Sequence, residues 1–306
     1  MRIGLFISST GGASLERMIE RFRVAENAGL QTAWAGHTFD WDALTLLALA
    51  GRATRRIELG SWVVPAPSRH PVALAQQAIT TQLACAGRLA LGIGASHPAV
   101  IEKRLGLDAA RPLRAMREQL ALLPRLLAGE KTEASGELYR IAVQLEDFGS
   151  ERPPVLLAAL GPRMLELAGR AADGVAIWLG GERFLEAHAL ARLDAGAASA
   201  GRARPRSVVG LPLCITTHPS AREAAERYVG PSARLPAYRS VLDRQGMAQA
   251  AEVALMGDED RVSRELARLA ALGVTDFNAI PFPVPEDPGA FDRTLAFLAT
   301  QARSAR

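Results

Sequence analysis

Residues 88–97 of the chain read Arg-Leu-Ala-Leu-Gly-Ile-Gly-Ala-Ser-His. The segment Leu89–Gly94 holds no polar side chain, which is typical of a strand buried on both faces of a parallel sheet. The preceding Gly87 is suited to end a helix, because glycine adopts a left-handed backbone without strain. Small residues and a histidine follow the strand. This order of helix, buried strand and polar loop predicts one unit of a parallel β/α protein.

The same alternation runs along the whole chain of 306 residues. We expect eight strands, at Arg2–Ile7, Thr32–Gly36, Ile57–Val64, Leu89–Gly94, Val155–Ala159, Val175–Trp178, Val208–Thr216 and Phe277–Ile280. A helical pattern follows each strand, and Ser14 and Pro71 mark the starts of two of these helices. Eight units favour a closed (β/α)8 TIM barrel that forms a single domain over residues 1–306. An open doubly wound sheet is the alternative, but no GxGxxG fingerprint follows the first strand.

Two segments do not fit this repeat. Residues 131–154 read as an insertion with a hairpin around Tyr139, and residues 229–257 carry no recognisable motif. Within the second segment, a solvated surface is favoured over a substrate-facing role for the side chains of Arg234, Tyr238 and Arg239.

The composition argues against several classes of protein. Hydrophobic residues make up 49% and charged residues 22%, which allows one large core. The net charge is +4 and no basic block is interleaved with aromatic residues, so no nucleic-acid partner is expected. No apolar run is long enough for a membrane span and no signal peptide precedes the first strand, so we expect a soluble, cytoplasmic protein. Cys85 and Cys214 lie in apolar segments without metal-ligand spacing, so no metal site is expected.

Polar residues follow the second strand, and the chemistry of a barrel collects at such strand ends. His37 comes directly after this strand, and Trp41 lies four residues later. An imidazole there can handle a proton, and an indole can wall a flat ligand. Alternatively, His37 is a hydrogen-bonded structural histidine and Trp41 packs on the barrel top.

The next three strands also end in candidate residues. They are Ser61, Trp62, Ser68, Arg69 and His70 after the third strand, Gly94, Ala95, Ser96 and His97 after the fourth, and Ala159, Leu160, Gly161, Pro162 and Arg163 after the fifth. The loop at residues 68–70 precedes a helix N-terminus, which attracts anions, although it can equally be a structural loop. Gly94 allows close backbone approach, and His97 adds a second imidazole on the same face. The turn at Gly161 and the charge of Arg163 can cradle a phosphate.

Other chemistries are not indicated. The sequence has no Walker A loop, no HExxH motif and no GxSxG elbow. The two strand-end carboxylates of a retaining glycosidase are missing. Asp173, which precedes Gly174, is expected in a turn rather than as a catalytic acid.

Read together, these segments resemble the luciferase-like flavin and deazaflavin oxidoreductases, most closely the branch that uses coenzyme F420. The strongest similarity lies in Ala-Trp-Ala-Gly-His at 33–37, Ile-Glu-Leu-Gly at 57–60, Arg-His-Pro at 69–71 and Gly-Arg-Leu-Ala-Leu-Gly-Ile-Gly at 87–94. Pro-Val-Leu-Leu-Ala-Ala-Leu-Gly-Pro at 154–162 and Ala-Asp-Gly at 172–174 extend it over most of the chain.

The resemblance implies a luciferase-like barrel that binds F420 and passes a hydride between the deazaflavin and a small organic substrate. It places His37 and Trp41 beside the ring, and it puts His97 where several members carry a glutamate that exchanges a proton. It also implies a homodimer. Either histidine can then supply or remove the proton that accompanies the hydride.

The resemblance further assigns the cofactor phosphate to the loop at residues 161–163, with residues 68–70 as a further candidate. Arginines at the rim would meet the oligoglutamate tail. A non-proline cis peptide is expected at Ser61–Trp62, against the ring.

Three departures from the family pattern matter. Gly36 replaces an aspartate, His97 replaces the glutamate and Leu160 replaces a glycine of the phosphate loop. A sugar-phosphate substrate is therefore not implied. Two alternatives stay open: an FMN-dependent monooxygenase on the same scaffold, and a barrel that binds a flavin or deazaflavin without catalysis.

Overall fold

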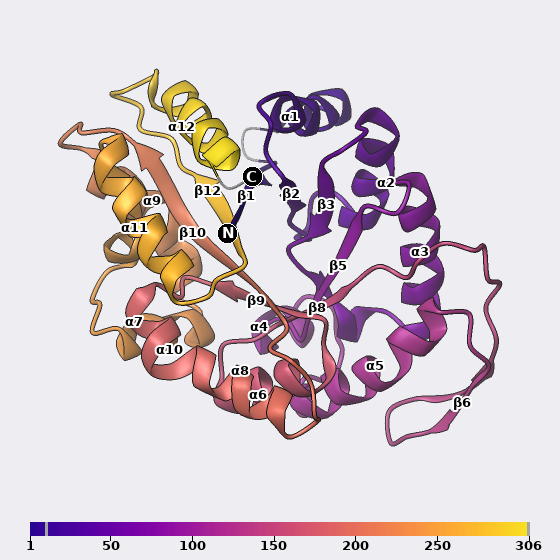
Figure 1. The fold of residues 1–306 in the computed structure, drawn as a ribbon. Coiled ribbons are helices and arrows are strands. Elements are labelled where there is room, and N and C mark those ends of the chain that lie inside the picture. Colours follow the sequence, from indigo (N-terminus) through magenta and orange to yellow (C-terminus); the bar gives the residue numbers. More distant parts are fainter. Residues whose placement is uncertain (10–11, 305–306) are drawn as a thin grey trace.

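The computed structural model describes residues 1–9 and 12–304. Its centre is a barrel of eight parallel strands, β1 (Arg2–Ile7), β2 (Thr32–Ala35), β3 (Glu58–Ser61), β5 (Leu89–Gly94), β8 (Val155–Ala158), β9 (Gly174–Trp178), β10 (Arg206–Ile215) and β12 (Asp276–Pro281). Each strand pairs with the next in this order, and β12 pairs back with β1. This closure confirms the predicted (β/α)8 barrel and rules out the open sheet (Figure 1).

Helices surround the barrel (Figure 1). They are α1 (Leu15–Asn27), α2 (Ala43–Ala53), α3 (Pro71–Ala84), α5 (Pro112–Leu127), α6 (Pro162–Ala171), α8 (Leu190–Ala198), α9 (Ala221–Ala233), α11 (Glu259–Ala271) and α12 (Ala290–Ser304). In α1, the Ser14 hydroxyl accepts a hydrogen bond from the N–H of Arg17 at 3.4 Å and so caps the first turn. Met18, Phe22 and Ala25 then recur every three or four residues and form the buried face.

Further elements lie outside the regular repeat. The predicted hairpin around Tyr139 is confirmed as β6 (Thr132–Ser135) paired antiparallel with β7 (Arg140–Val143). Short elements not predicted are η1 (Ala66–Ser68), α4 (Pro98–Ile101), α10 (Pro236–Arg244), η3 (Ala250–Val253) and β11 (Leu255–Gly257). The segment without a readable motif therefore contributes a helix and a strand that pairs with β10. The helix predicted from Glu182 to Ala198 is divided into α7 (Glu182–Phe184), a π-helical turn η2 (Leu185–Ala189) and α8.

The third strand differs from its prediction. It was expected to run unbroken to Val64, but β3 ends at Ser61 and a separate β4 (Val64–Pro65) pairs with the end of β5. The non-proline cis peptide joins Trp62 to Val63, so its predicted place at Ser61–Trp62 is wrong by one residue. The Ser61 hydroxyl donates to the carbonyl of Gly92 at 2.8 Å and accepts from its N–H at 2.9 Å, which bridges the gap in the ladder.

Two tryptophans fill the barrel interior. Trp34 is fully buried and donates from Nε1 to the Thr32 hydroxyl at 2.9 Å. Trp62 lies edge-on to it, with ring centroids 5.6 Å apart. A Cβ added at Gly210 would lie 2.7 Å from the Trp62 ring, so this indole reaches from β3 across to β10 on the opposite wall. Trp62 therefore forms a floor beneath the barrel mouth.

A cluster of ion pairs closes the other end of the barrel. Arg206 contacts Asp276 and Glu58, each at 2.6 Å, and Arg2 contacts Asp276 at 2.8 Å. Each of these four residues is the first residue of its strand, so the ion pairs lie at the N-terminal end of the barrel. The open end is consequently the C-terminal one, where the candidate residues lie.

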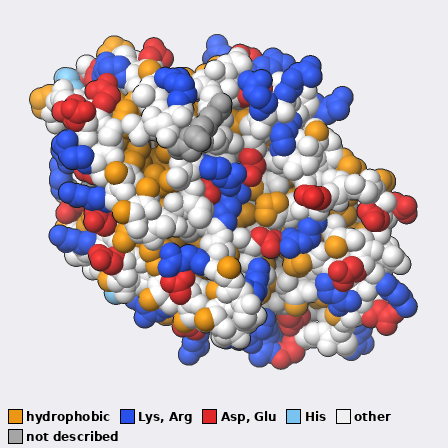
Figure 2. Space-filling model, in the orientation of Figure 1, with side chains coloured by type: hydrophobic (Ala, Val, Ile, Leu, Met, Phe, Trp, Pro, Cys, Tyr) orange, Lys and Arg blue, Asp and Glu red, His pale blue; other side chains and the backbone are white. Residues whose placement is uncertain are grey.

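The surface carries both signs of charge. Figure 2 shows basic and acidic side chains interspersed over one face. No helix in the described part of the chain is long and apolar enough to cross a membrane. Cys85 and Cys214 are buried, as predicted, and burial raises the pKa of each thiol to about 11.

Candidate active site

His37 follows the end of β2 and is held by the first turn of α2. Its Nδ1 accepts a hydrogen bond from the main-chain N–H of Ala43 at 3.1 Å, and its side chain is 14% exposed. In the neutral ring the proton therefore sits on Nε2, which leaves one donor for a ligand. Burial lowers the pKa of His37, and the charge of Arg69 lowers it further.

Arg69 and Asp42 join the loops after β2 and β3. Nη2 of Arg69 lies 2.6 Å from Oδ2 of Asp42, which is 3.8 Å from the His37 ring. Asp42 also caps α2 by accepting from the N–H of Thr45 at 2.9 Å. Burial opposes ionisation of Asp42, but the Thr45 hydrogen bonds and Arg69 outweigh it, so its pKa is lowered. The Arg69 guanidinium is thus paired with the carboxylate of Asp42, beside His37.

The neighbouring candidates Ser68 and His70 also make local contacts. The Ser68 hydroxyl donates to the carbonyl of Pro65 at 2.8 Å, and Nδ1 of His70 accepts from the N–H of Val72 at 3.3 Å. The His70 ring also packs against Tyr139 of the hairpin, with centroids 5.6 Å apart. This loop is therefore braced by the insertion.

His97 lies at the end of the loop after β5, just before α4. It is half-buried, and burial lowers its pKa. Its ring packs edge-on against Tyr238 of α10, with centroids 4.8 Å apart. The expectation of a solvated surface is wrong for Tyr238, although Arg234 is exposed as expected. The proline that opens α10, Pro236, was the available sequence signal for this helix.

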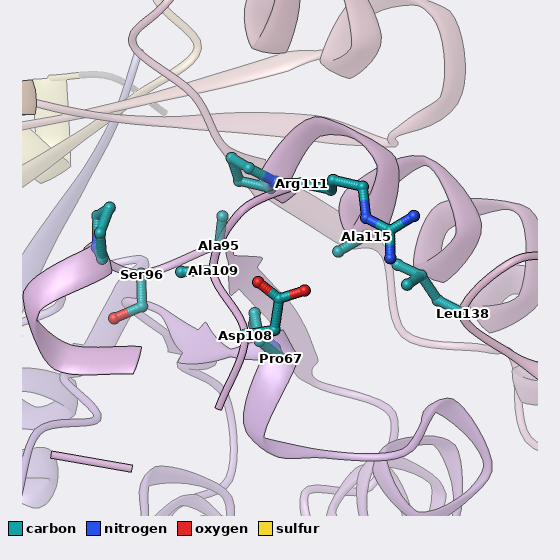
Figure 3. A pocket seen from close by; sticks show the side chains of 10 residues that line it. Pro67, Ala95, Ser96, Asp108, Ala109, Arg111, Ala115 and Leu138 are labelled. Atoms are coloured by element: carbon teal, nitrogen blue, oxygen red, sulfur yellow. The ribbon is translucent and has the colours of Figure 1, made fainter. Parts of the chain in front are cut away.

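A pocket opens on the other side of this loop (Figure 3). It is lined by Pro67, Ala95, Ser96, Pro98, Asp108, Ala109, Arg111, Pro112, Ala115 and Leu138. Ser96 has a left-handed backbone, with φ of 60°, at the turn between this pocket and His97. Of the predicted cofactor residues, the pocket brings together Ala95 and Ser96; sequence reasoning missed Asp108 and Arg111, which supply its charges.

The insertion forms part of this pocket. Glu118 of α5 accepts hydrogen bonds from the main-chain N–H groups of Leu138 and Tyr139, both at 3.1 Å. This contact holds the hairpin turn against α5 and brings Leu138 to the pocket. Arg111 pairs with Glu137 of the same turn at 3.3 Å.

The N-terminus of α6 is free of a side-chain cap. Gly161 occupies the cap position with an extended backbone, and Gly161, Pro162 and Arg163 are all exposed. Within the described residues, no hydrogen bond or ion pair engages the Arg163 guanidinium. Ala159 is buried and donates its N–H to the carbonyl of Ala176 at 3.1 Å, which fixes the start of the turn. Pro162 has no N–H and the N–H of Met164 donates to the Gly161 carbonyl at 3.1 Å, so the N–H groups of Gly161 and Arg163 are the ones left for an anion beside the unpaired Arg163 side chain.

Other titratable groups have structural roles. Asp173 pairs with Arg152 at 2.6 Å and accepts from the N–H of Val155 at 2.9 Å, in agreement with its predicted place in a turn. Among the residues that the structure describes, no group of three or more His, Cys, Asp or Glu side chains could hold a metal ion.

Sequence comparison identifies relatives of the chain. The model of the luciferase-like monooxygenase family matches residues 1–278. A 5,10-methylenetetrahydromethanopterin reductase of Archaeoglobus fulgidus is 31% identical over 183 residues, covering 60% of this chain and 54% of that protein. A Mycobacterium tuberculosis protein named as a coenzyme F420-dependent oxidoreductase is 32% identical over 193 residues, covering 58% of this chain and 55% of that protein. The chain thus matches about half the length of these two relatives.

Solved structures share the fold at low identity. The coenzyme F420-dependent tetrahydromethanopterin reductase of Methanopyrus kandleri superposes with a TM-score of 0.84 at 20% identity, over 99% of both chains. An F420-dependent secondary alcohol dehydrogenase gives 0.81 at 16% identity, over 100% of this chain and 99% of that one. The oxygenating constituent of 3,6-diketocamphane monooxygenase of Pseudomonas putida, solved with FMN, gives 0.79 at 19%, over 99% and 97%. The barrel and the match over residues 1–278 together show that the chain belongs to the luciferase-like monooxygenase family.

Proposed function

We propose that this protein is a coenzyme F420-dependent oxidoreductase that transfers a hydride between the deazaflavin and a small organic substrate. The observation that carries the proposal is the pair of imidazoles, His37 and His97, each with a lowered pKa, at a barrel mouth floored by Trp62. The relative named as an F420-dependent oxidoreductase supports the choice of cofactor. When bound, the deazaflavin would supply the hydride chemistry.

In this proposal a flat ring lies in the barrel mouth. Gly36 has no side chain, and a Cβ there would lie 3.0 Å from the Phe6 ring and 4.0 Å from the Trp62 carbonyl. Gly36 therefore packs directly against Phe6, next to His37. We assign ring contacts to Gly36, Ser61, Trp62, Gly94, Ala95 and Ser96, with Trp41 as a side wall.

A phosphate fits best at the start of α6. We assign it to residues 159–163, that is Ala159, Leu160, Gly161, Pro162 and Arg163, because this helix end has no side-chain cap and Arg163 is exposed. Residues 68–70 remain a further candidate, but Arg69 already contacts Asp42. Arg111, at the pocket beside Ala95 and Ser96, is half exposed and would leave its surface pair with Glu137 to meet acidic groups of the cofactor tail.

The two histidines take different roles in this proposal. His37 orients a polar group of the ligand through Nε2–H, because its Nδ1 is already bonded to the N–H of Ala43. His97 exchanges the proton, because burial favours its neutral form and the ring can then accept one. Tyr238 beside His97 and the floor formed by Trp62 would keep water from the reacting atoms.

Titration of the purified protein with F420 and with FMN tests the proposal. We expect F420 to bind and its absorbance to change when a carbonyl or enone panel is added to the reduced cofactor. Tight binding of FMN alone would favour the FMN-dependent monooxygenase, for which the fold shared with an FMN-containing structure is the supporting observation. F420 binding without any absorbance change across the panel would favour the non-catalytic protein.

We also infer a homodimer that forms through α2 and α3. Helix α3 has no charged residue although it lies on the outside of the barrel, and α2 has only Arg52. Leu49 of α2 and Leu83 of α3 are 40% and 41% exposed, and these two helices pack side by side. Uncharged adjacent outer faces are typical of a surface that another subunit covers.

A further inference from the structure

Tyr238 and His97 form a polar pair that the protein itself does not satisfy. Their rings are in contact, with centroids 4.8 Å apart and planes at 73°. In the described part of the chain, neither the phenol oxygen nor a nitrogen of the His97 ring has a hydrogen-bond partner, and both side chains are half-buried. In the described residues, the fully buried polar atoms without a partner do not include these, so the phenol oxygen and the ring nitrogens are open to solvent and a ligand can reach them.

Tyr238 is held in place by the docking of α10. The buried side chain of Gln245, just after this helix, accepts from the N–H of Gly181 at 2.9 Å and donates to the carbonyl of Leu179 at 3.0 Å. Arg239, next to Tyr238, donates to the carbonyl of Ala248 at 2.9 Å. Since the loop at residues 179–181 follows β9, these bonds tie α10 to the barrel mouth.

The hydrogen bonding of His97 differs from that of His37. The His37 ring must give up its bond from the N–H of Ala43 to take a proton on Nδ1. In the described part of the chain neither nitrogen of the His97 ring is engaged, so the unprotonated nitrogen of either tautomer can accept a proton. Burial raises the pKa of Tyr238 to about 12, so its phenol keeps its proton and acts as a donor at neutral pH. His97 can therefore accept a proton while the phenol of Tyr238 donates a hydrogen bond.

We propose that Tyr238 is a further substrate-binding residue which, together with His97, brackets the reacting oxygen of an alcohol or carbonyl substrate. A hydroxyl and a carbonyl interconvert at such an oxygen, and an acceptor beside a donor serves both forms. This inference rests on the proposed F420-dependent function. In the oxidative direction the hydroxyl proton passes to a nitrogen of His97, the carbinol C–H bond breaks with its electron pair and hydrogen going to the oxidised deazaflavin, and a C=O bond forms. The phenol of Tyr238 donates to that oxygen throughout.

The first test needs neither cofactor nor turnover. The chain has five histidines, so the imidazole signals can be followed by NMR across a pH titration and assigned with His97→Gln. We expect Tyr238→Phe to leave the His97 signals and titration unchanged because the ring is kept. Tyr238→Leu should move both, because the aromatic contact is lost. Tyr228→Phe, on a ring that packs against Phe282 instead, is the matched control. Unmoved His97 signals in Tyr238→Leu would overturn the proposal.

The second test measures how much the hydroxyl of Tyr238 contributes to turnover. Small alcohols and their matching ketones are offered with F420, and the absorbance of the cofactor is followed. We expect turnover by the wild type and a fall in kcat/KM of about three- to tenfold in Tyr238→Phe, the effect of one lost hydrogen bond, with an unchanged Kd for F420. Wild-type kcat/KM in Tyr238→Phe overturns the proposal, as does F420 binding by the wild type without turnover of any alcohol or ketone. The first result leaves F420-dependent catalysis standing and the second leaves F420 binding standing, whereas absence of F420 binding overturns the proposed function as well.

Discussion

The main-chain N–H of Ala43 donates a hydrogen bond to Nδ1 of His37 at 3.1 Å. The bond comes from the first residue of α2, so the ring orientation is set by the helix start. It assigns the neutral tautomer with the proton on Nε2. Because burial and Arg69 lower the pKa of His37, this uncharged donor is the form present at neutral pH.

Substitution of His37 should separate hydrogen-bond donation from proton transfer. We expect His37→Ala to lower kcat/KM about tenfold to hundredfold, because a donor to developing charge is lost. His37→Gln should retain more activity, since its amide can place N–H groups near the position of Nε2. Steady-state kinetics with F420 decide this. Equal loss in both variants, or none in His37→Ala, would contradict the donor role.

The pH dependence of kcat/KM should be set by the ionisation of His97. Burial lowers its pKa below the ordinary value of 6.5, so the neutral, proton-accepting ring persists above that pH. Activity in the oxidative direction is then present above 6.5 and lost as the pH falls through the lowered pKa. We expect kcat/KM to show an acid limb below 6.5 that His37→Gln keeps and His97→Gln loses. An acid limb above 6.5, or one that survives His97→Gln, would count against this assignment.

The barrel could be predicted because its strands are apolar on both faces and because Gly and Pro mark the helix boundaries. Leu89–Gly94, for instance, is a strand in the structure with the predicted bounds. Peptide geometry leaves no such pattern, which explains the misplaced cis bond next to Trp62. The contact between His97 and Tyr238 was missed because it joins the repeat to a helix outside it, and side-chain contacts between segments far apart in sequence have no periodic signal.

Because the indole of Trp34 lies against Gly60, any side chain at position 60 should destabilise the fold. A Cβ at Gly60 would lie 2.2 Å from the Trp34 ring, which is fully buried and cannot move away. We expect Gly60→Ala to lower the free energy of unfolding by about 1–3 kcal/mol or more. Gly161→Ala is the control, because a Cβ there meets nothing within 4 Å. Denaturant titrations of both variants check this, and equal stability would contradict the tight fit around Trp34.

The proposed dimer should dissociate when charge is added to its faces. Leu49→Glu and Leu83→Glu together would bury two carboxylates per subunit if α2 and α3 form the interface, which is unfavourable without partners. We expect this variant to sediment as a monomer where the wild type sediments as a dimer. Val24→Glu, on the exposed face of α1 and 38% exposed before substitution, should leave the assembly unchanged. A monomeric wild type would disprove the homodimer itself.

The N-terminus of α6 should distinguish cofactors with and without a phosphate. Arg163→Ala removes the exposed guanidinium beside the uncapped helix end, so we expect the Kd for F420 to rise about tenfold to hundredfold, the range for a charge-assisted hydrogen bond. Binding of the deazaflavin chromophore without its phosphate-bearing tail should not change, because that ligand makes no contact there. Arg170→Ala, at the far end of the same helix, removes the same charge from the surface and should bind both ligands as the wild type does. Fluorescence titrations of the two ligands compare the variants directly. An equal effect of Arg163→Ala on both ligands would mean that this turn does not hold the phosphate, and the loop at residues 68–70 would then be the next place to test.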